Sequence, residues 1–135
     1  MQKTFSILSV VFFLLLFSQC ASDQRRLNRL LMLEAAALNA TTPDILNEYI
    51  RLDSASVTSD NRFQFHHTVL NTETPDLLID RSAQELKELA RFLYFTTPEM
   101  VIFRENRVTI EYIFSDENGR IINTIAITPE DYNQL

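Results

Sequence analysis

Apolar and polar residues follow two different periods along this chain. Over residues 23–39 the apolar positions, among them Leu27, Leu31 and Leu38, recur with helical spacing, and no Gly or Pro interrupts them. Over residues 62–70 apolar and polar residues instead alternate, as they do in a strand with one buried face. The first pattern predicts a helix and the second predicts a strand.

The alternating segments predict two hairpins. Residues 51–58 form a second strand pattern, which turn-forming residues join to the strand over 62–70. Residues 108–114 and 120–128 are the other pair, separated by an Asn-Gly pair at positions 118–119. Such a pair suits a two-residue turn, because both of its positions need a positive φ.

Helices are predicted between the two hairpins. Residues 71–80 are a polar connection, and the Ser-x-x-Glu pattern at positions 82–85 is a capping box that opens an apolar helical stripe. A Thr-Pro pair at positions 97–98 is typical of another helix start. It predicts a short helix over residues 100–104, with a strand over residues 101–103 as the alternative.

The predicted element order is helix, two strands, helix, short helix and two strands. This order indicates an α+β fold. We expect a two-layer sandwich in which two main helices cover a four-stranded antiparallel sheet. Residues 27–135 are expected to form this single domain, preceded by a tether over residues 20–26 and a cleaved signal peptide over residues 1–19.

The N-terminus has the layout of a secretory signal peptide. Lys3 supplies a positive charge, residues 5–17 are an uncharged apolar run, and small or polar residues follow. The run is shorter than the roughly 20 apolar residues that a spanning helix needs. We therefore expect export and removal of residues 1–19; the alternative is an internal helix of the domain.

The only cysteine, Cys20, follows the apolar run directly. Bacterial lipoproteins place an apolar residue and two small residues before the cysteine that is acylated, and residues 17–20 resemble that pattern. The departures are Phe17, where Leu is usual, and Gln19, where a smaller residue is usual. A lipid on Cys20 would anchor the protein to a membrane of the bacterial envelope, whereas cleavage after Cys20 or Ser22 by ordinary signal peptidase would leave it free in the periplasm.

Composition excludes several kinds of site. One Gly is too few for a Gly-rich phosphate loop, and one Cys allows neither an internal disulfide nor a Cys-rich zinc site. The formal net charge of -6 argues against nucleic acid as a partner, and 46% hydrophobic residues argue against disorder. Composition and motifs together predict no cofactor.

The two histidines are adjacent on a predicted strand. His66 and His67 should therefore point to opposite faces of the sheet, so they cannot jointly bind one metal ion. His67 shares its face with apolar residues, which predicts a partly buried histidine. A site made of one histidine and several acids is the alternative; we expect no metal ligands.

Carboxylates are numerous, but none lies in a catalytic motif. Asp53, Glu99, Glu111 and Asp116 are candidates for the paired acids of a glycosidase. The segment from Asp116 to Gly119 lacks the series of oxygen ligands of a calcium loop. We expect a solvated acidic surface and no catalytic residue.

Arg25, Arg26 and Arg29 form a basic cluster next to the processing region. One interpretation is a solvated face of the first helix. The other is a membrane-proximal cluster, in which each arginine could add ~1 kcal/mol of attraction to anionic headgroups if Cys20 is acylated.

Several segments resemble small exported bacterial proteins of unassigned function. These segments are residues 34–57, 97–100, 108–113, 116–119 and 125–131. The resemblance implies export, an Ala-rich helix and two hairpins, and it implies no catalytic residues. The pattern of those proteins carries cysteines near the end of the second helix and near the C-terminus. In this chain those regions contain Phe95-Thr96 and Asp131-Tyr132. The pair of cysteines is therefore absent here.

These observations predict a non-enzymatic exported protein, tethered to the membrane through Cys20, that acts by binding an envelope protein or an apolar ligand. A partner could add a strand to an open sheet edge, or the cleft between helix and sheet could hold a lipid or other apolar ligand, as in pilot-type lipoproteins. One alternative is a secreted inhibitor or immunity-type protein whose acidic surface blocks a basic enzyme. Another is a small hydrolase that uses carboxylates.

Overall fold

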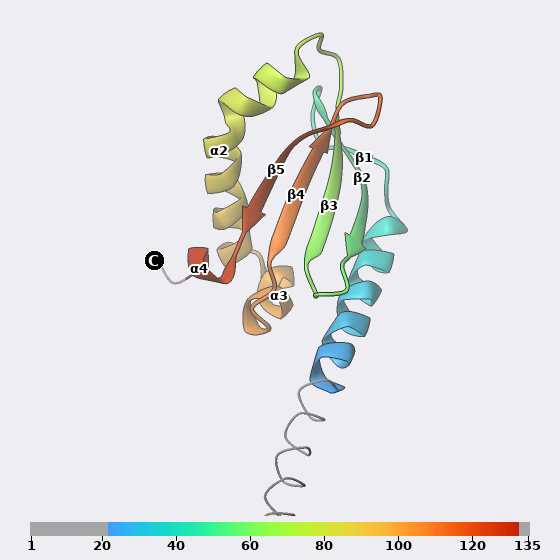
Figure 1. Cartoon of the computed structure of the whole chain (residues 1–135), viewed down its shortest axis with the longest axis vertical. Helices are drawn as coiled ribbons and strands as arrows, with labels where there is room; N and C mark the ends of the chain where they lie inside the picture. Colours follow the sequence, from blue (N-terminus) through green and yellow to red (C-terminus); the bar gives the residue numbers. More distant parts are fainter. Residues whose placement is uncertain (1–21, 133–135) are drawn as a thin grey trace, which may run out of the picture.

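The computed structural model describes residues 22–132, which form a five-stranded sheet with helices packed against it (Figure 1). In chain order the elements are a helix over residues 22–39, β1 (Asp44–Ile45), β2 (Ile50–Val57), β3 (Phe63–Val69), α2 (Pro75–Thr96), η1 (Pro98–Met100), α3 (Val101–Glu105), β4 (Ile110–Ser115), β5 (Ile121–Ile127) and α4 (Pro129–Tyr132). The predicted first helix and four predicted strands are all present. The short elements β1 and α4 were not predicted.

The sheet is mixed, with its strands in the order β1-β2-β3-β4-β5. Neighbouring strands are antiparallel except β3 and β4, which run parallel. The α+β class is therefore confirmed, but the expected four-stranded antiparallel sheet is wrong in strand number and in direction. The physical reason is the connection from β3 to β4, since α2, η1 and α3 return the chain to the end at which β3 began.

The helix α2 begins at Pro75, so part of the predicted polar connection over residues 71–80 is helical. A proline in the first turn costs no hydrogen bond, because the N–H groups of that turn have no partner within the helix. The added turns bury Ile79, which is only 1% exposed and packs in a core cluster with Val69, Phe114 and Ile125. Burial of Ile79 against the sheet therefore outweighs the capping box as a determinant of the helix start.

The short helix predicted after the Thr-Pro pair is confirmed as η1 and α3. The alternative strand over residues 101–103 is not formed. Phe103 is buried in α3 and contacts Phe63 edge-on, with ring centroids 4.9 Å apart. This contact secures the short helix to the sheet.

The turn between β4 and β5 lies where it was predicted but belongs to a different type. Gly119 has a φ of +82°, whereas Asn118 does not have a positive φ. The N–H of Gly119 donates to the carbonyl of Asp116 at 2.9 Å, and the N–H of Asp116 donates to the carbonyl of Arg120 at 2.9 Å. This is a three-residue loop, in which a type I turn precedes a left-handed glycine. The Asp116 carboxylate favours it by accepting from the N–H groups of Asn118 and Arg120.

The helix over residues 22–39 includes residues 22–26, which were expected to belong to a tether. Its first turns are held by Asn61 in the turn between β2 and β3. The Asn61 amide donates to the Gln24 side chain at 2.5 Å, and the Asn28 amide donates to Asn61 at 2.8 Å. The start of the helix is therefore part of the folded domain. The predicted signal peptide, residues 1–19, and Cys20 lie outside the described residues.

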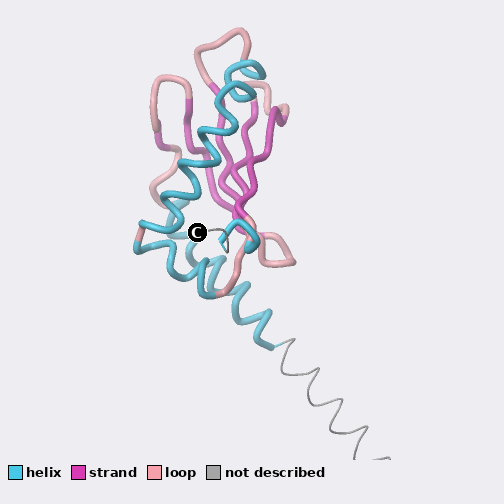
Figure 2. Tube along the Cα trace, turned by 90° about the vertical axis from the view of Figure 1, so that its left-hand side faces the viewer, coloured by secondary structure: helices cyan, strands magenta, loops and turns pink. Residues whose placement is uncertain are grey.

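One face of the sheet and the helices enclose the core. The main buried cluster joins Leu31 and Ala35 of the N-terminal helix, Ala90 and Tyr94 of α2, and residues of the sheet and α3. Figure 2, seen from the side of α2, shows this helix crossing in front of the strands. None of the described helices is long and apolar enough to cross a bilayer.

Candidate binding pocket

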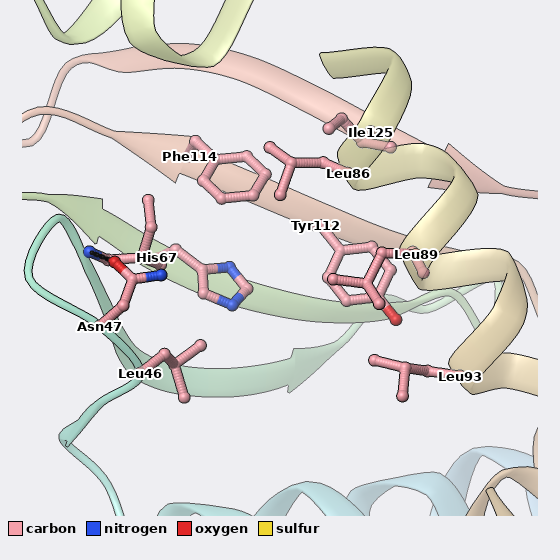
Figure 3. Close-up of a pocket in the computed structure, with 11 residues that line it drawn as sticks. Leu46, Asn47, His67, Leu86, Leu89, Leu93, Tyr112, Phe114 and Ile125 are labelled. Carbon is pink, nitrogen blue, oxygen red and sulfur yellow. Dashed lines mark hydrogen bonds between the residues drawn. The ribbon is translucent and has the colours of Figure 1, made fainter. Parts of the chain in front are cut away.

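A cavity of about 240 Å³ opens between α2, the inner face of the sheet and the loop after β1 (Figure 3). The residues that line it are mostly apolar: Leu46, Asn47, Ile50, His67, Leu86, Leu89, Ala90, Leu93, Tyr112, Phe114 and Ile125. We call this cavity the pocket.

Strand alternation supplies the floor of the pocket. His67 on β3 pairs in register with Phe114 on β4, and Tyr112 pairs with Ile125 on β5. Since paired residues of adjacent strands lie on the same face, these side chains project together toward α2. The rings of His67 and Phe114 are stacked, with centroids 5.0 Å apart and an angle of 20° between planes.

The helix α2 supplies one wall. Leu86, Leu89 and Leu93 are three or four residues apart, so they lie along one side of the helix. Leu89 is 53% exposed and Leu93 is 42% exposed, and Leu46 on the facing loop is 52% exposed. The pocket therefore has a buried floor and a rim of exposed leucines.

His67 is the polar side chain of the buried floor. It is 6% exposed, and its Nδ1 atom has no hydrogen-bond partner among the described residues. Burial lowers the pKa of His67 below its ordinary value of 6.5, although the backbone of Ile113 and, less strongly, the Asp53 carboxylate oppose this shift. The imidazole is therefore neutral at neutral pH, and it leaves the pocket uncharged. The prediction placed a partly buried histidine on the apolar face; His67 does lie on that face and is more deeply buried than expected.

His66 lies on the other face of the sheet, as predicted. Its Nε2 atom is 2.7 Å from the hydroxyl of Ser56 on β2. The two histidines therefore do not meet at one site. Within residues 22–132, no group of three or more His, Cys, Asp or Glu residues is placed to hold a metal ion.

The four candidate carboxylates have different surroundings. Asp53 pairs with Arg51 and accepts a hydrogen bond from Thr68 at 2.6 Å. Glu111 pairs with Arg62 at 2.8 Å.

The third carboxylate, that of Asp116, accepts hydrogen bonds from the backbone N–H groups of Asn118 and Arg120. The hydrogen bond from the N–H of Arg120 lowers the pKa of Asp116. Glu99 is exposed on η1. Asp53, Glu111 and Asp116 thus make contacts within the fold, and none of the four lines the pocket.

The basic cluster lies on the first turns of the N-terminal helix. Arg25, Arg26 and Arg29 are all exposed there, and none of them lines the pocket. The cluster and the pocket are therefore separate surfaces.

A cleft between helix and sheet was expected from the sequence as one place for an apolar ligand, but the residues that line the pocket were not identified. The leucine stripe of α2 and the alternation in β3 and β4 indicate only which side of each element faces the core. Leu46 follows the two-residue strand β1, which has no pattern of its own. Because that loop closes the pocket, the complete site could not be predicted.

Comparison with known proteins identifies the fold. No protein-family model matches this sequence, and no curated protein matches it. A Pseudomonas aeruginosa protein described as secreted shares the fold with a TM-score of 0.69 and 14% identity, over 79% of this chain and 93% of its own.

Two pilotins of type II secretion systems also share the fold. The Vibrio vulnificus pilotin aligns with a TM-score of 0.63 and 15% identity, over 85% of this chain and 99% of its own. The Vibrio cholerae pilotin aligns with a TM-score of 0.61 and 14% identity, over 82% of this chain and 96% of its own. At these identities the similarity shows a common fold, and it carries no residue assignments.

Proposed function

We propose that this protein is an exported envelope protein, anchored to a membrane through a lipid on Cys20, that binds an apolar segment of another envelope protein in the pocket. The observation that carries the proposal is the combination of a buried apolar floor with a rim of exposed leucines. Contiguous exposed apolar surface around a concavity is typical of interaction sites.

The size of the pocket favours a protein segment over an enclosed small molecule. Pockets that bury a drug-sized ligand usually measure about 300–1,000 Å³. The cavity of about 240 Å³ is smaller, and Leu46, Leu89 and Leu93 remain exposed around it. A partner that places a few apolar side chains in the cavity and rests its backbone on the rim would cover both. An amphipathic helix laid in a groove binds in this way.

The comparisons support an envelope role. Structures with this fold include a protein described as secreted and two type II secretion pilotins. By analogy, we propose a component of a secretion system as the partner. The signal-peptide pattern and the position of Cys20 support export and anchoring independently of the fold.

Site-specific photocrosslinking tests the pocket. A photoreactive amino acid at Leu89 should crosslink, in cells, to an apolar segment of one envelope protein. The same group at Leu77 should not, because Leu77 is 52% exposed on the same helix but does not line the pocket. Adducts from the Leu89 position that contain only lipid would overturn the protein partner. Equal adducts from both positions would overturn the pocket as the binding site.

A peptide made from the crosslinked segment provides the quantitative test. Leu89→Glu should weaken its binding at least about tenfold, because the charge enters an apolar contact. Leu77→Glu is the matched control and should bind like the unmodified chain. Circular dichroism spectra of both variants should match that of the unmodified chain, since both side chains are already half exposed.

Mass spectrometry of the processed N-terminus tests the anchor separately. A lipid-modified Cys20 is expected. A free N-terminus at the residue after Cys20 or Ser22 would contradict the anchor while leaving the pocket proposal intact.

A further inference from the structure

The outward face of the N-terminal helix carries cationic and apolar side chains in sequence. Its first part, the basic end, consists of Arg25, Arg26 and Arg29, all exposed. Its second part, the apolar patch, consists of Leu30, Met32 and Leu33, which are 40%, 57% and 62% exposed. Positively charged residues are thus followed by apolar residues along one exposed surface of the helix.

The other face of the helix determines this orientation. Leu31 is 0% exposed and Ala35 is 5% exposed in the main core cluster, and Leu27 packs against the same cluster. Asn28 donates a hydrogen bond to the carbonyl of Thr58 at 3.0 Å. The basic end and the apolar patch therefore cannot turn inward. Figure 1 shows the first turns of the helix extending beyond the strands at one end of the molecule.

The three arginines form no ion pair with any described residue. Elsewhere Arg51, Arg62 and Arg120 each pair with a carboxylate. In a chain of net charge -6, the basic end is thus a local excess of uncompensated positive charge. The acidic residues of the same helix are Asp23, in its first turn, and Glu34, beyond the apolar patch.

The sequence before the helix places a membrane next to it. In the proposed function residues 1–19 are removed and a lipid on Cys20 attaches the chain to the membrane, and the helix begins at residue 22. Two extended residues span at most about 7 Å, so an anchor on Cys20 holds the helix start within that distance. The attraction of anionic lipid acts over a Debye length of about 8 Å at physiological salt.

We propose that this face is a membrane-docking surface for an anionic lipid bilayer. The guanidinium groups of the basic end contact the headgroups, and the apolar patch enters the boundary between headgroups and acyl chains, as in interfacial amphipathic helices. The domain then lies against the membrane. The inference rests on the membrane attachment in the proposed function, and it is independent of the pocket.

Tryptophan fluorescence tests the docking, because the chain contains no Trp. The processed chain that begins at the lipid-modified Cys20 and carries Leu33→Trp is reconstituted with vesicles of phosphatidylcholine alone, or of phosphatidylcholine mixed with phosphatidylglycerol. We expect a blue shift and quenching by brominated lipid in the anionic vesicles, and smaller changes in the zwitterionic ones. A Leu77→Trp reporter on α2, which starts at the opposite end of the molecule in Figure 1, should show neither.

A matched charge test separates the basic end from general electrostatics. Arg25→Gln with Arg29→Gln should abolish the blue shift of the Leu33→Trp reporter. Arg81→Gln with Arg120→Gln removes the same charge from two exposed positions away from the N-terminal helix and should preserve it. Raising the salt concentration should weaken the shift in the unmodified helix, since headgroup attraction is screened.

The results that would contradict the docking surface differ from the result that would contradict the membrane attachment. A chain that sediments with vesicles but shows no shift of the Leu33→Trp reporter overturns this proposal alone. Equal shifts in both kinds of vesicle, or a shift unaffected by the arginine changes, also overturn it. A blue shift that grows with protein concentration in the absence of vesicles would show that the face binds a second copy of the chain, and it would overturn the proposal. Failure to sediment with either vesicle overturns the membrane attachment as well.

Discussion

His67 shows how one side chain defines the chemistry of the pocket. A histidine between apolar neighbours would add a charge to the floor if it were protonated, and that charge would oppose an apolar partner. Its burial keeps it neutral instead. The polar Nδ1 atom remains as a point where a partner could form a hydrogen bond.

The depressed pKa of His67 predicts a pH-dependent stability. The unfolded imidazole binds a proton near pH 6.5, whereas the folded one resists it because of burial. Unfolding therefore takes up a proton as the pH falls through 6.5 toward the lower folded pKa, so the free energy of unfolding decreases in that window. The slope is at most about 1.4 kcal/mol per pH unit for one such group. Denaturant unfolding at about pH 7.5 and about pH 5.5 measures it.

Two variants test whether His67 causes this pH dependence of the free energy of unfolding. His67→Phe keeps an aromatic ring in the floor and should flatten the pH dependence. His66→Gln, on the opposite face, should retain it. An unchanged slope in His67→Phe would show that another group is responsible.

The contact between α2 and the second hairpin illustrates how elements are joined. Arg120, just before β5, makes two hydrogen bonds to Asp76 in the first turn of α2, at 3.0 and 2.8 Å, and one to Asp116 at 3.0 Å. These bonds lower the pKa of Asp76 and raise that of Arg120. The side chains of Arg120 and Asp76 are 57% and 49% exposed, so burial of Ile79 and its apolar neighbours contributes most of the stability at this contact.

Gly119 is a conformational requirement of this hairpin. A Cβ atom added there would meet no heavy atom within 4 Å, so space is available, but the φ of +82° disfavours any residue with a side chain. We expect Gly119→Ala to destabilise the protein by about 1 kcal/mol through backbone strain. Thermal unfolding measures the change. Asn118→Ala, without a positive φ, should cost less, and an equal cost would contradict strain at residue 119 as the cause.

At the scale of the whole molecule, the N-terminal helix closes the core while it carries the face that we propose docks on a membrane. Leu31, which is 0% exposed, packs with residues of the sheet, α2 and α3. Leu33, two positions along, is 62% exposed. One helix therefore couples the end nearest the predicted anchor to the folded domain that carries the pocket.

The same two leucines give a prediction about this coupling. Leu31→Ala should lower the free energy of unfolding by about 2–5 kcal/mol, because it leaves a cavity between helix and sheet. Leu33→Ala should change it by at most about 0.5 kcal/mol. Chemical denaturation of both variants tests the difference. Similar small effects would mean that the helix is not part of the cooperative unit.

Local patterns were sufficient for several elements of the fold. The helix over residues 22–39 and the strands β2, β3, β4 and β5 follow from spacing between near neighbours. The opposite orientations of His66 and His67 follow from alternation alone. Short-range backbone geometry sets these features, so they can be predicted without knowledge of distant contacts.

Tertiary contacts decided the rest. The parallel pairing of β3 with β4, the early start of α2 at Pro75 and the strand β1 depend on partners far away in sequence. The pocket depends on them most, because Leu46, His67 and Leu89 have no local relation to one another. The sequence determined which side chains face the core and where the chain turns. Only the packing of helix against sheet decided which of those side chains meet, since burial is a property of the assembled layers.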